Sequence, residues 1–96
     1  MKIDVCGIPF SVERVSGSFS CKPDPFGESD AIRATIKISS LCSPEQFDAT
    51  LIHEWAHGVC QCYGCDSNEP MILALSQELY RLGFRVKILD SKEKSK

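Results

Sequence analysis

The stretch that decides the fold is residues 43–64, which read SPEQFDATLIHEWAHGVCQCYG. Its first residues predict a helix start: Ser43 is a favourable N-cap, Pro44 suits the first helical position, and Gln46 completes a capping box. Gly64 predicts the end, because glycine readily adopts the left-handed conformation that terminates helices. The stretch therefore predicts one long helix that runs up to this glycine.

A helical wheel of residues 47–63 is apolar almost all round, so we expect this helix to be buried. One polar arc interrupts the apolar surface, and only Asp48, in the first turn, lies outside that arc. A buried helix with a single polar stripe faces a cleft or a polar site. The arc consists of Thr50, His53, Glu54, His57 and Gln61.

The motif His53-Glu54-Trp55-Ala56-His57 lies within this arc. Histidines four residues apart project from one helix face, so both imidazoles can reach a single zinc ion. Glu54 lies ~100° around the helix from His53, which places its carboxylate beside the metal rather than on it. There it can deprotonate a metal-bound water and pass the proton to a leaving amine, as a catalytic base. The alternative is an accidental spacing of two ordinary histidines, although both histidines of the chain fall in the motif.

A catalytic zinc ion normally takes three protein ligands, and the chain has no third histidine. Glu69 is the main candidate, because a turn at Gly64 would fold a second helix back against the first. Pro70 disfavours helical geometry at Glu69 and would favour a capping role for it. The alternative ligands are Asp66, Cys60 and Cys65.

Six cysteines stand in the chain, and three of them form a C-x-C-x-x-C run at residues 60–65. Without a recognisable signal peptide we interpret them as thiols rather than as a disulfide framework. Cys60 fits a small buried apolar residue. A separate or composite structural zinc site that also uses Cys62 and Cys65 is the functional alternative.

The remaining segments predict a single α+β domain over residues 1–96, with a small sheet packed on the active-site helix and a second helix. The sheet is expected to contain an N-terminal hairpin and further strands. The predicted elements are strands at 2–5 and 9–15, an irregular loop at 16–30, a strand at 31–38, a helix at 69–82, a strand at 84–89 and a frayed tail at 89–96. The second helix is expected to bury Ile72, Leu75, Leu79 and Leu82 and to stop at Gly83.

Composition narrows the function classes. The chain of 96 residues is 43% hydrophobic and 25% charged, as in an ordinary globular protein. Its net charge of −2 argues against nucleic acid as the main partner. No apolar stretch is long enough to span a membrane. These features predict a cytoplasmic protein.

The sequence resembles the small phage-type zincin-like metallopeptidases, related in motif to the ImmA/IrrE and SprT-like groups. The resemblance runs from about Val5 to about Leu82 and is strongest in the segment 50–57. It also includes segments 5–10, 27–30 and 63–64, and then Glu69, Ile72, Leu75, Leu79 and Tyr80. It implies an α+β fold with His53, His57 and Glu69 as zinc ligands and Glu54 as general base. It also implies a peptide or protein substrate, and the host cytoplasm as location if a phage encodes the chain.

Three functions follow as competing hypotheses. The first is a zinc metallopeptidase in which Glu54 activates water. The second is a zinc-stabilised module that binds a protein without cutting it. The third is a cysteine-rich zinc or redox protein in which the thiols dominate.

Overall fold

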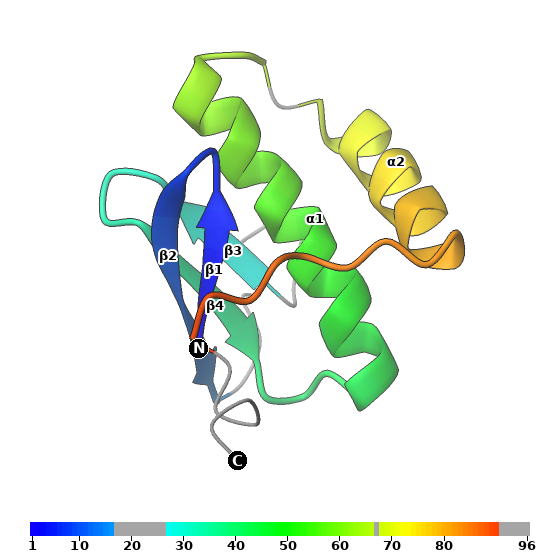
Figure 1. Ribbon diagram of the computed structural model, residues 1–96. Coiled ribbons are helices and arrows are strands. Elements are labelled where there is room, and N and C mark those ends of the chain that lie inside the picture. The colour runs from blue at the N-terminus through cyan, green and yellow to red at the C-terminus, as the bar shows by residue number, and fades with distance from the viewer. Residues whose placement is uncertain (17–26, 67, 91–96) are drawn as a thin grey trace.

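The computed structural model describes residues 1–16, 27–66 and 68–90, and these residues form one small sheet and two helices (Figure 1). The predicted α+β class is confirmed. The elements are β1 (Lys2–Val5), β2 (Ile8–Val15), β3 (Gly27–Asp30), β4 (Thr35–Ser39), α1 (Pro44–Tyr63) and α2 (Glu69–Arg81).

The sheet is mixed and has the strand order β1-β2-β4-β3. β1 and β2 form the predicted antiparallel hairpin, β2 and β4 run parallel, and β3 returns antiparallel to β4. β3 is therefore the strand at one edge of the sheet. α1 packs across the sheet against β3, β4 and β1, and α2 packs on α1 on the side away from the sheet (Figure 1).

The hydrophobic core lies between the sheet and α1. Alternate residues of the strands point into it, as the two-residue period of a strand requires. Burial of these aliphatic and aromatic side chains is the main force that holds the helix on the sheet. The buried apolar side chains include Ile3, Val5, Phe10, Ile36, Ile38, Leu51 and Ile52.

The predicted signals at both ends of α1 are confirmed. Ser43 Oγ accepts from Gln46 N–H at 3.2 Å, and Gln46 Oε1 accepts from Ser43 N–H at 3.1 Å, which completes the capping box. Pro44 is the first helical residue. Gly64 adopts φ 71° and its N–H bonds back to the last turn. The long helix is thus fixed by local chemistry at its two ends.

The predicted strand at 31–38 is wrong in its first half, because β4 begins at Thr35. Asp30 Oδ1 accepts from the N–H groups of Ile32 and Arg33 at 3.1 and 3.2 Å, and this turn interrupts the chain. Ile32 is 97% exposed and Ala34 has a positive φ of 52°. The alternating sequence pattern therefore begins at residue 31, before the strand itself begins at Thr35.

The predicted loop at 16–30 is wrong at residues 27–30, which form β3, whereas residue 16 lies outside any strand or helix. This strand carries no large apolar side chain that would have marked it in the sequence. Residues 17–26 of that predicted loop lie outside the described residues.

The predicted strand at 84–89 is not a strand, although the segment does run beside β1. One isolated bridge joins Ile3 to Ile88, and Leu89 N–H donates to Lys2 O at 2.8 Å. Asp90 Oδ1 accepts from Lys2 N–H at 2.7 Å. The first two residues of the predicted tail are therefore held against the sheet, whereas residues 91–96 lie outside the described residues.

The buried face of α2 differs from the predicted one. Ile72 and Ser76 are buried and Leu79 is partly buried, whereas Leu75 and Leu82 are largely exposed. The helix ends at Arg81, and Gly83 follows with φ 98°. Because α2 packs on a single helix, the face it buries is narrow.

Neither helix of the described chain combines the length and the apolar character that a membrane crossing requires.

Candidate metal centre

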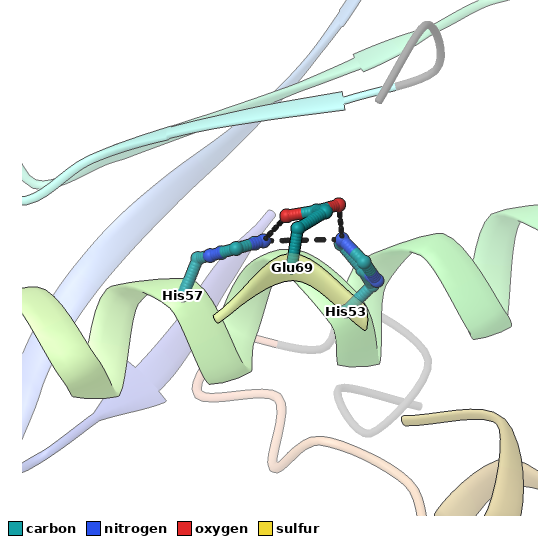
Figure 2. A group of neighbouring side chains, drawn as sticks. All are labelled: His53, His57 and Glu69. Atoms are coloured by element: carbon teal, nitrogen blue, oxygen red, sulfur yellow. Dashed lines mark hydrogen bonds and ion pairs between the residues drawn. The ribbon is translucent and has the colours of Figure 1, made fainter. Parts of the chain in front are cut away.

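His53, His57 and Glu69 meet between α1 and α2 (Figure 2). The two histidines rise from successive turns of α1, as their four-residue spacing predicts. Glu69 reaches them from the first turn of α2. One ligand atom from each side chain lies within 4.8 Å of the other two, and the group could hold a metal ion.

Glu69 is in place because α2 begins at this residue. Asn68 is the N-cap, and its Oδ1 accepts from Met71 N–H at 3.0 Å. Pro70 is the second helical residue, where the missing N–H would have no partner within the helix. The predicted capping role thus belongs to Asn68, and Glu69 is free to point its carboxylate at α1.

The contacts among the three side chains are short. Glu69 Oε2 lies 2.9 Å from His53 Nε2, and Glu69 Oε1 lies 2.7 Å from His57 Nε2. The two Nε2 atoms are 3.1 Å apart. The side chain of His53 is 6% exposed and that of Glu69 is 35% exposed, so the centre is buried on the α1 side and open on the α2 side.

With Glu69 ionised, protons on the two rings do not account for these three contacts together. A proton on either Nε2 can point at the carboxylate or at the other ring, but not at both. If both nitrogens carry protons, they face each other without an acceptor lone pair. If only one does, a nitrogen lone pair faces a carboxylate lone pair. A cation at the centre accepts lone pairs from all three side chains and removes the conflict.

The opposite edge of the His53 ring contacts α2 at Ser76. Ser76 Oγ donates to Leu73 O at 3.1 Å and lies 3.4 Å from His53 Nδ1. When the one proton of the hydroxyl points at Leu73 O, Ser76 Oγ can accept from His53 Nδ1, which then carries the ring proton. This tautomer leaves the Nε2 lone pair directed at the centre, as in histidine ligands of metals.

Glu54 faces a different neighbour from the histidine beside it. Its carboxylate Oε1 lies 2.9 Å from Ser29 Oγ on β3, and Ser29 Oγ also donates to Glu54 O at 2.6 Å. Gly27 of β3 packs on the same side chain, since a Cβ added there would lie 2.8 Å from Glu54 Cγ and Oε2. Glu54 is 2% exposed. β3 therefore covers and orients this carboxylate.

Gln61, like Glu54, contacts β3 and the turn that follows it. Its Oε1 accepts from Ala31 N–H at 2.8 Å, and its Nε2 donates to Ser29 O at 3.4 Å. The predicted polar stripe of α1 is thus divided between two partners. His53 and His57 face α2, whereas Glu54 and Gln61 face β3 and the turn that follows it.

The alternative ligands are not members of the group that could hold an ion, among the residues that the structure describes. Asp66 and Cys65 are exposed, and Cys60 is half-buried on α1. Sequence reasoning did not find Ser29 and Ser76. No local signal marks them, because their partners lie 25 and 23 residues away along the chain.

Comparisons of the chain with protein-family models, with curated proteins and with solved structures find no match. The function is therefore inferred from the chemistry of the site itself.

Proposed function

We propose that the protein is a zinc-dependent hydrolase that cleaves peptide bonds, with His53, His57 and Glu69 as metal ligands and Glu54 as general base. The observation that carries the proposal is the convergence of two imidazole nitrogens and a carboxylate from two different helices. Two histidines with one carboxylate form a common ligand set of catalytic zinc sites.

One of the three separations is close to the value expected for zinc. Two ligand atoms of a tetrahedral zinc ion lie about 3.3 Å apart, given bond lengths of about 2.0–2.1 Å. The two Nε2 atoms, at 3.1 Å, are close to this value. The nitrogen–oxygen separations of 2.7 and 2.9 Å are shorter. Glu69, which lies at a helix start and is partly exposed, would have to move outward for zinc to be held.

When bound, zinc supplies a Lewis acid that polarises a carbonyl group and lowers the pKa of water. The chain supplies the rest. His53 and His57 would hold the ion on α1, and Ser76 would fix the orientation of the His53 ring. Glu54 takes the proton of the attacking water at its carboxylate and delivers it to the leaving amine. Ser29 and Gly27 hold that carboxylate in one position.

The proposal is tested by measuring bound zinc and the cleavage of an unfolded protein, such as reduced casein. The Glu54→Gln variant keeps the shape of the side chain and removes its basicity. We expect this variant to keep one zinc per chain and to lose cleavage by roughly 10²–10⁴-fold. Equal cleavage by the variant would show that Glu54 is not the general base. A protein of unchanged sequence without bound zinc would contradict the metal centre.

One observation favours a second candidate, a zinc-stabilised module that binds a protein without hydrolysis. Glu54 is 2% exposed beneath β3, so a water must reach it past Ser29 and Gly27. This candidate predicts one zinc per chain, a large loss of thermal stability in a chelator, and no cleavage by the unchanged sequence. The same two measurements therefore separate the candidates.

A further inference from the structure

The face of α1 that packs on β1 brings two cysteines together. Trp55 Nε1 donates to Asp4 O at 3.1 Å. One turn later, a Cβ added at Gly58 would lie 3.2 Å from Val5 Cγ1. Residues 55, 58 and 62 share one helix face, because residues three and four apart are neighbours on a helix. Cys62, on the same helix face, is therefore expected to lie opposite the residue that follows Val5 in the chain.

That residue is Cys6, in the turn between β1 and β2. It has a positive φ of 55° and is exposed, whereas Cys62 is half-buried. Cys62 is close enough to Cys6 to raise the pKa of its thiol, so the two side chains are neighbours. Partial removal from water raises the pKa of the Cys6 thiol, and Cys62 and the Asp4 carboxylate raise it further, while a hydrogen bond with Tyr63 lowers it.

The other described cysteines are arranged differently. Cys60 and Cys62 are two residues apart on a helix and point to different sides. Cys42 is buried, with its sulfur 3.8 Å from Thr50 Oγ1. Cys65 is exposed beyond the end of α1, where its N–H donates to Cys60 O at 2.9 Å.

We propose that Cys6 and Cys62 form a reversible oxidation site, which a small-molecule disulfide converts to an intramolecular disulfide. The cross-link joins the β1–β2 turn to the last turn of α1. It anchors the end of α1 from which the chain continues to the Glu69 ligand, and it does not depend on the proposed hydrolase activity.

The reaction is thiol–disulfide exchange. One cysteine thiolate attacks a sulfur of glutathione disulfide, forms a mixed disulfide and releases one glutathione thiolate. The second cysteine thiolate then attacks the protein sulfur of the mixed disulfide and releases the second glutathione. The two protons of the cysteines end on the two glutathione thiols. The protein loses two electrons, and glutathione disulfide gains them.

The test exposes the full-length chain to glutathione disulfide at pH 8, where the raised pKa of the Cys6 thiol matters less than at neutral pH. Intact mass and peptide mapping follow the product. We expect the mass to fall by two hydrogens and the map to show one peptide that links Cys6 to Cys62. Dithiothreitol should reverse both. The cross-link closes a long loop, so Tm should rise by roughly 10 °C.

Single serine variants provide the controls. Cys6→Ser and Cys62→Ser should stop at the mixed disulfide, seen in the peptide map as glutathione on Cys62 or Cys6, respectively. Cys60→Ser and Cys65→Ser should still form the cross-link. Circular dichroism shows that each variant is folded. A linked peptide confined to residues 60–65, or glutathione on both Cys6 and Cys62 without closure, would overturn the proposal.

Discussion

Replacing Ser76 with alanine should weaken metal binding without unfolding the protein. Ser76 is 2% exposed, and its Oγ lies 3.4 Å from His53 Nδ1 on the side of the ring opposite the metal centre. Alanine removes the acceptor that holds the Nδ1 proton. The His53 ring is then no longer fixed in the tautomer that directs its Nε2 lone pair at the ion.

The magnitude follows from the contacts that are lost. Loss of such a supporting hydrogen bond costs about 10–100-fold in metal affinity, which corresponds to about 1.4–2.7 kcal/mol. The effect on the metal-free protein is smaller. The bond from Ser76 Oγ to Leu73 O is worth about 1 kcal/mol, and alanine regains about half of this because it is the better helix former.

The assay is a competition titration with a chromophoric zinc chelator, together with urea unfolding of the metal-free protein. Ser39→Ala is a matched control, because Ser39 is also fully buried and its Oγ accepts from Leu41 N–H at 3.1 Å. This control should lose stability and keep its zinc affinity. A zinc affinity of Ser76→Ala within about twofold of the unchanged sequence would refute the reasoning, since a supporting bond is worth more than this.

Two further substitutions test the elements that hold Glu54 and Glu69. Gly27→Ala places a Cβ 2.8 Å from Glu54 Cγ and Oε2, so we expect cleavage of unfolded casein to fall by about tenfold or more, with one zinc per chain retained. Full cleavage would show that Glu54 moves aside at no cost. Asn68→Ala removes the acceptor of Met71 N–H and should lower the free energy of unfolding in urea by about 1 kcal/mol. Asn68→Asp should recover most of the lost free energy of unfolding. An Asn68→Ala variant with unchanged stability would contradict the capping role of Asn68.

The parts of the fold that sequence predicts well are those whose causes lie within a few residues. The ends of α1 are of this kind, because Ser43, Gln46 and Gly64 satisfy backbone groups of adjacent turns. The hairpin of β1 and β2 is also local. The two histidines are placed by helical spacing alone, and Glu69 follows once α2 folds back on α1.

The parts that sequence does not predict depend on contacts between distant segments. Asp30 ends β3 and turns the chain by accepting from the N–H groups of Ile32 and Arg33, although the apolar pattern through Ile32 favours a strand. β3 lacks the apolar residues of a recognisable strand and is fixed by pairing with β4. Ser29 and Ser76 acquire their roles only through the helix each one faces.

The division of the α1 stripe has a consequence for the mechanism. His53 and Glu54 are adjacent in sequence, but ~100° of helix rotation turns one toward α2 and the other toward β3. Of the proposed metal ligands, His53 is therefore supported by Ser76, whereas the proposed base Glu54 is supported by Ser29 and Gly27. Ser76 belongs to α2, whereas Ser29 and Gly27 belong to β3. Metal affinity and proton transfer should therefore respond separately to substitution. A substitution at Ser76 on α2 should change the affinity for zinc. A substitution at Gly27 on β3 should change the rate of cleavage by the zinc-bound protein.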